Sequence, residues 1–288
     1  MAEVWTVRRM IAWMQADFER RGIEAARLEA DLLLAHALGV KRIALFLDPE
    51  RPLDARELAA IRALVERRRA REPIAYILGQ REFYGRAFKT TRDVLVPRPD
   101  TETLVDEARA FLRERAPEGR VLDLCTGSGA IAVTLAAECP GREVVASDVS
   151  AAALAVAREN AASLGVEART TFREGDLFAV LDADERFACV TVNPPYIAAA
   201  EIETLAADVR DFEPRLALDA GADALSFYRR IAREVGARLV TGGAVFLEVG
   251  IGQAVEVAAL LADAGLAEVR TTRDLAGIER VVSATQAG

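Results

Sequence analysis

The chain has 288 residues, 52% of them hydrophobic and 28% charged, which is typical of a soluble globular protein and argues against a disordered one. The net charge of −8 is unevenly placed along the chain. Residues 1–97 carry 18 basic and 14 acidic side chains, whereas residues 98–288 carry 19 basic and 31 acidic ones. This acidic second part is poorly suited to binding along a nucleic-acid backbone. One histidine and three cysteines exclude histidine-based triads, a disulfide framework and a His-ligated zinc centre.

Residues 3–80 have the apolar periodicity of helices. In the first of them, apolar side chains recur at spacings of three and four from Val4 to Phe18, and Gly22 ends the helix. Further helices are expected over 27–38, 41–47, 54–71 with Asp54 as N-cap, and 73–79. The sequence therefore predicts a small all-helical domain over residues 1–79.

A run of positive charge closes the fourth of these helices. It consists of Arg67, Arg68, Arg69 and Arg71. Two interpretations are open: a solvated helix end that the helix dipole favours, or a patch that docks a partner.

Residues 80–97 change from helical to strand-like composition. Segments 83–88 and 94–96 are rich in aromatic and apolar residues, which favours the two strands of a β-hairpin. Two prolines follow, and the next helix begins at Asp100 or Thr101. We expect residues 80–97 to be a hairpin linker between two domains.

From residue 119 onward, short apolar runs alternate with helical segments. Strands are expected over 121–124, 143–147, 169–172, 188–192, 244–248, 266–272 and 279–284, with helices over 129–138, 150–163, 222–237 and 253–264. This alternation predicts an α/β fold with a mostly parallel, doubly wound sheet, and the closing strand–loop–strand pair suggests an antiparallel edge strand. The second domain is expected to span residues 98–288.

The first of these strands leads into a glycine-rich turn, Asp123-Leu124-Cys125-Thr126-Gly127-Ser128-Gly129. Its small residues let the backbone approach a ligand and present N–H groups at a helix start. The spacing differs from that of dinucleotide-binding turns, and the turn lacks the lysine of a phosphate loop. A carboxylate at Asp123 would repel a pyrophosphate but suits an ammonium group, such as that of S-adenosylmethionine. A plain tight turn is the alternative.

Two further carboxylates follow the next strands. Asp148 is placed to accept both hydroxyls of a ribose, and its alternative role is the N-cap of the helix over 150–163. Asp176 is placed to meet an adenine amine, and its alternative role is that of a turn former beside Gly175.

The tetrapeptide Asn193-Pro194-Pro195-Tyr196 follows the fourth strand. Two prolines cannot continue a strand, so the segment is a stiff loop at a strand's carboxyl end, where open α/β sheets bind ligands. The Asn193 side-chain oxygen and a backbone carbonyl can accept the two hydrogens of a planar NH2 group, and Tyr196 can stack on its plane. These residues predict a pocket for an amide or an exocyclic base amine.

Together, these strand-end motifs resemble those of the class I S-adenosylmethionine-dependent methyltransferases. The Asn-Pro-Pro-Tyr version is typical of members that methylate adenine, cytosine or glutamine amide nitrogens. The closer resemblance is to the release factor glutamine methyltransferases of the PrmC/HemK type. It rests also on Arg81 to Tyr84, Pro97 to Glu102, Asp211 to Pro214, Ala217-Leu218 and Gly277 to Val281.

The resemblance implies a Rossmann-like, seven-stranded methyltransferase domain that uses S-adenosyl-L-methionine and releases S-adenosyl-L-homocysteine. It implies that residues 1–79 dock class 1 peptide chain release factors, whose Gly-Gly-Gln glutamine is the substrate. The implied donor contacts are Asp123, Cys125, Thr126, Gly127, Ser128, Gly129, Asp148, Asp176, Leu177 and Asn193. The implied glutamine contacts are Asn193, Pro194, Pro195 and Tyr196.

The expected mechanism relies on orientation, because an amide nitrogen is a poor nucleophile. The Asn193 side-chain oxygen and the Pro194 carbonyl would bind the amide hydrogens, while Tyr196 packs against the amide plane. These three residues are the candidate catalytic residues, and no metal is expected. Many methyltransferases have glycine where this chain has Cys125, so we expect an ordinary negative φ there.

Two other functions remain open on the sequence alone. One is a DNA or RNA amino-methyltransferase that holds an extruded base. The other is a non-catalytic module that binds release factors. Since there is no long apolar run and no secretory signal, we expect a cytoplasmic protein that does not bind a membrane. We also expect a monomer that does not bind nucleic acid directly.

Overall fold

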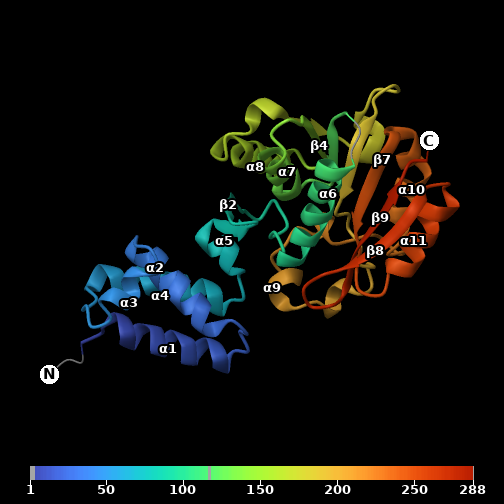
Figure 1. The fold of residues 1–288 in the computed structure, drawn as a ribbon. Coiled ribbons are helices and arrows are strands. Elements are labelled where there is room, and N and C mark those ends of the chain that lie inside the picture. Colours follow the sequence, from blue (N-terminus) through green and yellow to red (C-terminus); the bar gives the residue numbers. More distant parts are fainter. Residues whose placement is uncertain (1–3, 116–117, 288) are drawn as a thin grey trace. The chain divides into compact units, whose positions relative to one another are not determined.

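The computed structural model describes residues 4–115 and 118–287, which group into two compact units. The first unit runs to Gly79 and includes the short segment Ala207–Phe212. The second comprises Gln80–Ala206 and the chain from Glu213 onward. In Figure 1 the first unit is mostly blue and the second runs from green to red. No helix in the described residues is long and apolar enough to cross a membrane.

The first unit is helical and has a core of its own. Its helices are α1 (Val7–Arg20), α2 (Ala26–Leu38), α3 (Ala44–Leu47), α4 (Ala55–Arg69), α5 (Ile74–Leu78) and the short α9 (Ala207–Arg210). The apolar stripe of α1 faces inward, and Met14 and Phe18 are completely buried against side chains of α2 and α4. Asp54 begins α4 with a capping box, in which its side chain accepts from the Glu57 backbone N–H.

The arginine run of α4 is tied into this unit by carboxylates. The ion pairs are Arg67 with Glu72, Arg68 with Glu29 and Arg69 with Asp17. Because Asp17 lies on α1 and Glu29 on α2, these arginines join three helices. Arg68 is therefore buried within the unit rather than solvated, whereas Arg67 remains 43% exposed, and the docking interpretation of the run stays a prediction.

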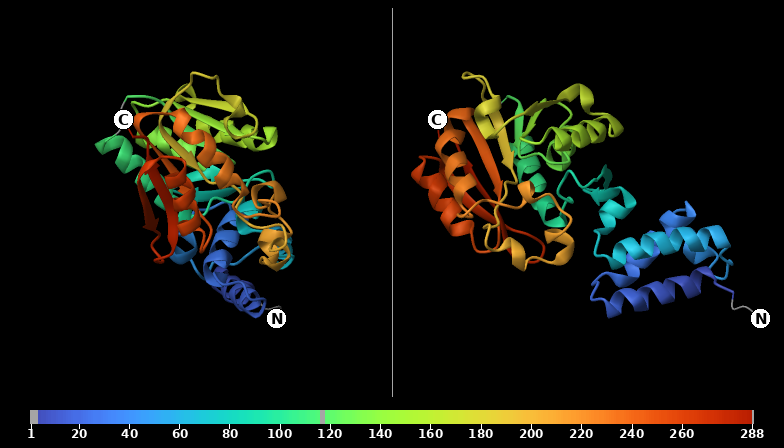
Figure 2. Two further views of the ribbon diagram at one scale, coloured as in Figure 1. Left: turned by 90° about the vertical axis from the view of Figure 1, so that its right-hand side faces the viewer. Right: turned by 180° about the vertical axis from the view of Figure 1, so that it is seen from behind.

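The second unit is a sheet with helices on both faces (Figure 2). Its sheet strands are β3 (Val121–Leu124), β4 (Val144–Asp148), β5 (Thr170–Glu174), β6 (Phe187–Val192), β7 (Leu239–Glu248), β8 (Ala267–Arg273) and β9 (Glu279–Thr285). Its α-helices are α6 (Glu102–Glu114), α7 (Ala130–Glu138), α8 (Ala151–Ser163), α10 (Ser226–Arg238) and α11 (Ala254–Asp263). Single turns of 3-10 helix are η1 (Pro99–Thr101), η2 (Glu167–Arg169), η3 (Leu177–Val180), η4 (Ile202–Thr204) and η5 (Arg215–Ala217).

The seven strands formed by the described residues follow the order β5-β4-β3-β6-β7-β9-β8. All neighbouring pairs from β5 to β7 are parallel, and β9 runs antiparallel to both β7 and β8. The predicted α/β fold with a mostly parallel sheet is confirmed, and the reversed strand is β9, which lies between β7 and the edge strand β8. Side chains of α10 and α11 cover one face, whereas those of α6, α7 and α8 cover the other.

A two-stranded hairpin, β1 (Gln80–Phe83) and β2 (Arg86–Lys89), precedes the sheet. Its turn residues Tyr84 and Gly85 both have positive φ, at 51° and 69°, as a tight hairpin turn requires. The predicted strand over 83–88 is wrong because this turn lies within it. The predicted strand over 94–96 is also wrong, since these residues have irregular backbone.

The hairpin belongs to the second unit and packs against its helices. Phe83 and Phe88 are buried in the core beside α6 and α7. The Asn160 side chain of α8 accepts from the Lys89 backbone N–H at 2.7 Å and donates to the Lys89 carbonyl at 3.1 Å. The hairpin is thereby fastened to the sheet unit by both apolar burial and hydrogen bonds.

Candidate active site

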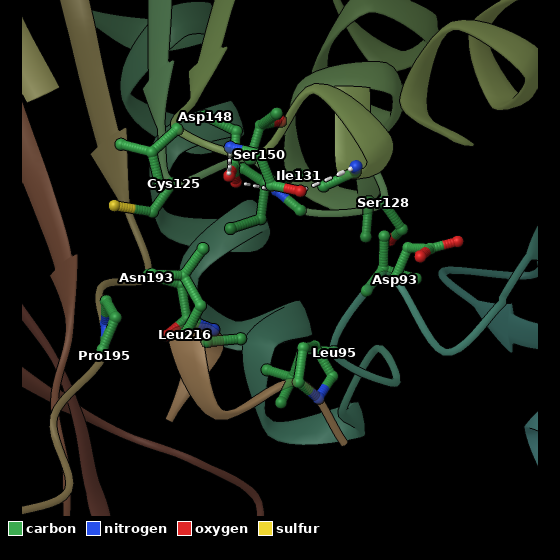
Figure 3. A pocket seen from close by; sticks show the side chains of 18 of the residues that line it. Asp93, Leu95, Cys125, Ser128, Ile131, Asp148, Ser150, Asn193, Pro195 and Leu216 are labelled. Carbon is green, nitrogen blue, oxygen red and sulfur yellow. Dashed lines mark hydrogen bonds between the residues drawn. The ribbon is translucent and has the colours of Figure 1, made fainter. Parts of the chain in front are cut away.

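A cavity of about 340 Å³ lies at the carboxyl ends of β3, β4, β5 and β6. This size is within the usual range for a small-molecule site. Figure 3 shows Cys125 and Asp148 on one side of it, Asn193 and Pro195 on another, and Asp93 and Leu95 across from them. The predicted residues that line it are Cys125, Thr126, Gly127, Ser128, Asp148, Asp176, Leu177, Asn193 and Pro195.

The glycine-rich turn after β3 is bent by three left-handed residues. Cys125, Gly127 and Gly129 have φ values of 57°, 53° and 79°. The expected negative φ at Cys125 is therefore wrong. The turn requires the left-handed conformation at this position whichever residue occupies it. For a residue that has a Cβ atom, this conformation costs about 1–2 kcal/mol. At Gly129, an added Cβ would lie 3.1 Å from the Ala157 Cβ of α8, so glycine also permits close helix packing.

Asp123 lies beneath this turn and does not line the cavity. Its side chain is fully buried and accepts hydrogen bonds from the Thr126 hydroxyl at 2.6 Å and the Thr191 hydroxyl at 2.8 Å. The expected direct contact with a donor ammonium group is therefore not supported. Asp123 instead ties the turn to β6, because it sits on the buried middle strand and its oxygens are directed to these hydroxyls.

Two buried carboxyl groups make the stability of this unit depend on pH. Burial raises the pKa of Asp123 and that of Glu248, at the end of β7, each to about 7. The folded state thus holds these protons more tightly than the unfolded chain, so stability falls as pH rises toward and through 7. Between pH 6 and 8 we expect the free energy of unfolding to fall by about 1 kcal/mol per group. Urea denaturation at both pH values measures this, and the Glu248→Gln variant should show a smaller decrease.

Asp148 faces the cavity and also holds the turn in place. Its two oxygens accept from the backbone N–H groups of Gly127 and Ser150, each at 2.9 Å, and burial raises its pKa. The Ser150 side chain caps α8 by accepting from the Ala153 N–H at 3.1 Å. Asp148 is therefore not the helix cap, and its carboxylate is placed at the cavity wall.

Asp176 and Leu177 line the cavity after β5. The Asp176 side chain is 52% exposed and pairs with Arg230 of α10 at 2.6 Å. Leu177 has a φ of 46° and is buried, so the backbone between β5 and η3 turns sharply here. Asp176 is thus shared between a surface ion pair and the cavity.

The tetrapeptide after β6 is only partly in contact with the cavity. Asn193 and Pro195 line it, whereas Pro194 and Tyr196 do not. The Tyr196 ring packs against the core that α10 and α11 cover, and burial raises its pKa to about 12. Its backbone carbonyl accepts from the Gln253 side chain at 3.0 Å, which fixes the loop beside α11.

One cavity wall was not predicted from the sequence. It consists of Asp93, Val94, Leu95, Pro97, Arg98 and Thr101, with Pro214, Leu216, Ala217, Phe227 and Arg230. Arg98 forms an ion pair with Glu213, which is almost fully buried and also accepts from the Val96 N–H at 3.4 Å. Both residues lie in motifs that carry the family resemblance, but nothing in the sequence indicated that they pair.

Family models match both parts of the chain. Residues 9–79 match the PrmC N-terminal domain, and residues 101–210 match the methyltransferase small domain. A methyltransferase structure from Pyrococcus furiosus is 14% identical, covers 79% of this chain and 98% of that chain, and has a TM-score of 0.52, which supports the fold alone.

Curated relatives cover almost the whole chain. The release factor glutamine methyltransferase of Geobacter sulfurreducens is 45% identical over 280 residues, covering 97% of this chain and 96% of the relative. That of Bordetella pertussis is 50% identical over 255 residues, covering 88% of this chain and 93% of the relative. With the cavity at the predicted strand ends, these similarities show that the chain belongs to the release factor glutamine methyltransferase family.

Proposed function

We propose that this protein transfers a methyl group from S-adenosylmethionine to the side-chain amide nitrogen of the glutamine in the Gly-Gly-Gln motif of class 1 release factors. The observation that carries this proposal is that Asn193 lines the same cavity as Asp148 and the glycine-rich turn. An acceptor for an amide NH2 group thus stands beside a site suited to a nucleoside.

The cavity wall suits the methyl donor. The Asp148 carboxylate can accept from ribose hydroxyls, and Asp176 lies at the next strand end for the base. Leu95, Ile131 and Val149 add apolar surface to the same wall. S-adenosylmethionine, when bound, supplies an electrophilic methyl group on a positively charged sulfur.

Methyl transfer to the glutamine depends on the orientation of its side-chain amide rather than on a general base. The Asn193 side-chain oxygen and the Pro194 carbonyl accept the two amide hydrogens of the glutamine, which directs its nitrogen at the methyl group. These acceptors also favour the positive charge that develops on nitrogen during transfer, and the nitrogen then loses one of its two hydrogens to water as a proton. In this mechanism Pro195 shapes the cavity wall, and Tyr196 holds the loop and meets the glutamine when the release factor is bound.

The direct test offers three acceptors to the protein with labelled donor. These are an intact class 1 release factor, its Gly-Gly-Gln→Gly-Gly-Ala variant, and DNA. We expect label only on the intact factor, at the glutamine side chain by mass spectrometry. Label on DNA would support the base-methylating alternative, and donor and factor binding without transfer would support a non-catalytic module.

We further propose that the helical unit docks the release factor. Four apolar side chains in or beside α3 are exposed: Val40 at 42%, Ile43 at 61%, Phe46 at 47% and Leu47 at 79%. Ile43, Phe46 and Leu47 are spaced three and four residues apart, so they share one helix face. Because a cluster of exposed apolar side chains is typical of a surface that binds another protein, we assign the release factor to this face.

Polar substitution tests this docking surface. The Ile43→Ser/Leu47→Ser double variant should raise the KM for the intact release factor by about tenfold or more, since a few central apolar residues dominate such interfaces. Its activity on a short Gly-Gly-Gln peptide should be unchanged, because the peptide lacks the rest of the factor, which this surface is proposed to bind. Equal KM values for the factor in variant and wild type would contradict the assignment.

We also propose that the protein acts in the cytoplasm and that it is a monomer. Light scattering, which measures the molar mass in solution, can check the monomeric state.

Replacing Asp148 by asparagine should weaken donor binding. Asparagine has one acceptor oxygen, so it cannot serve both the Gly127 and Ser150 N–H groups and also a ribose. We expect affinity for S-adenosylhomocysteine, measured by calorimetry, to fall by about 10- to 100-fold, or 1.4–2.8 kcal/mol. Asp176→Asn is the matched control and should lose less, because Asp176 is half-exposed. An equal loss in both variants would count against the ribose role.

A further inference from the structure

Glu248 is a buried carboxyl group beside the proposed acceptor site. It ends β7, which runs parallel to β6, and the register pairs Val192 with Leu247. The next residues of the two strands, Asn193 and Glu248, are therefore neighbours at the same sheet edge. Glu248 is only 2% exposed and does not line the cavity.

The carboxyl group of Glu248 lies beside the side chains of Asn193 and Thr101, which are themselves hydrogen-bonded. Thr101, at the start of α6, and Asn193 both lie close enough to Glu248 that their side chains lower the pKa of its carboxyl group. The Asn193 Nδ2 atom also donates to the Thr101 hydroxyl at 3.5 Å. In the part of the chain that the structure describes, the Glu248 Oε2 atom has no hydrogen-bond partner, so the group retains an acceptor.

Glu248 is not required as the partner of the nearby buried arginine. Arg280 is bound to Asp274 at 3.2 Å and to Asp100 at 3.3 Å. Its guanidinium also donates to the Val249 carbonyl at 3.3 Å. Because burying a carboxylate is costly and Arg280 is already paired with two others, a purely ion-pairing role does not account for Glu248.

These contacts determine which end of the Asn193 amide meets the substrate. An asparagine side chain has a donor end and an acceptor end of almost the same shape. In its ionised form a carboxylate accepts only, so Glu248 favours the arrangement in which the NH2 end of Asn193 is directed to the Thr101 hydroxyl and toward Glu248 itself. The side-chain oxygen is then left for the cavity, which Asn193 lines.

We propose that Glu248 is a positioning residue for methyl transfer, which holds the Asn193 side chain so that its oxygen accepts from the glutamine NH2 group. This inference rests on the proposed function. It adds a residue that touches neither donor nor substrate. Without Glu248, the Asn193 amide can turn over and present its own NH2 group to that of the glutamine, which repels it.

Exchanging the amide and the carboxyl group between positions 193 and 248 tests the proposal. Wild type, Glu248→Gln, Asn193→Asp and the double variant are compared in steady-state assays with an intact release factor. We expect kcat of Glu248→Gln to fall by about 10- to 100-fold, because a catalytic group that is slightly misplaced typically costs this much. The affinity for the methyl donor should change by less than about threefold. Asn193→Asp should lose more, since two carboxyl groups then face each other.

The double variant provides the decisive comparison. Its side-chain amide at position 248 would donate to the carboxylate at position 193, which restores a donor–acceptor pair and leaves one carboxylate oxygen for the substrate glutamine. We therefore expect kcat of the double variant to exceed that of Asn193→Asp by about tenfold or more. A role of Glu248 in folding alone predicts additive losses, so a double variant no better than Asn193→Asp would overturn the proposal. Wild-type kcat in Glu248→Gln would overturn it as well.

Two controls keep these outcomes interpretable. Glu185→Gln removes another largely buried carboxylate, paired with Arg120 and Arg173 away from the cavity, and should leave kcat unchanged. If Glu248→Gln does not fold, Thr101→Val and Thr101→Ser replace it, and only the serine variant should retain most of the activity. Equal activity in the two Thr101 variants would overturn the proposal. Absence of transfer by wild type would instead overturn the proposed function, and this inference with it.

Discussion

Replacing Asn193 by alanine is expected to lower kcat for glutamine methylation by about 10³-fold, close to abolishing it. The side-chain oxygen is one of two proposed acceptors for the amide hydrogens, and removal of one such group in an active site typically costs this much. Donor affinity should change little, because the glycine-rich turn and Asp148 remain intact. The measurement combines initial rates on an intact release factor with calorimetry of S-adenosylhomocysteine.

The donor titration also serves as the folding control for this variant. Alanine removes the hydrogen bond that the Asn193 side chain donates to the Thr101 hydroxyl. The loop is still held by the Gln253 side chain, which donates to the Tyr196 carbonyl. Unchanged donor binding together with lost turnover would place the defect at the acceptor. Turnover near that of wild type would refute the assignment of Asn193.

Replacing Arg68 by alanine is expected to have the largest effect on stability. Its side chain is 5% exposed and pairs with Glu29 through bonds of 2.6 and 3.3 Å, and it also donates to the Glu72 carbonyl at 3.2 Å. Removing one partner of a buried ion pair leaves the other charge uncompensated, at a cost of about 3–5 kcal/mol. We expect the helical unit to unfold at a much lower urea concentration.

The two tryptophans make this effect measurable in the whole chain. Trp5 and Trp13 are the only tryptophans in the sequence and both lie in the helical unit, so their fluorescence follows its unfolding. Arg62→Ala, at an exposed position of the same helix, is the matched control and should change stability by less than about 0.5 kcal/mol. Arg68→Met/Glu29→Met should recover most of the loss, because no charge is then left buried. A loss in Arg68→Ala as small as that in the control would contradict the structural role of the pair.

The elements of this fold could be predicted where local chemistry determines them. The apolar stripe of α1 and the Asp54 cap of α4 are local signals, and both are present in the structure. The alternation of apolar and helical segments after residue 119 predicted the parallel sheet for the same reason. The hairpin was misplaced because its turn, Tyr84-Gly85, interrupts a run of aromatic residues that looked like a continuous strand.

Part of the candidate site could also be predicted from the sequence. Asp148 and Asn193 follow predicted parallel strands, and the carboxyl ends of such strands meet at one edge. Asp123 has the same kind of position, but its side chain is directed to Thr126 and Thr191 inside the sheet. The direction of a side chain at a strand end depends on neighbours that a linear pattern does not place.

By itself, the amino-acid sequence determined the order of the elements, the sheet type and the strand ends that carry polar residues, because hydrophobic periodicity and turn chemistry act over a few neighbouring residues. The tertiary structure alone decided the left-handed backbone at Cys125, the Arg98–Glu213 pair and the placement of Glu248 beside Asn193. These features arise from contacts between segments far apart in the chain, such as Arg98 and Glu213, whose positions differ by 115. Only packing the sheet, with its register and covering helices, brings such residues together.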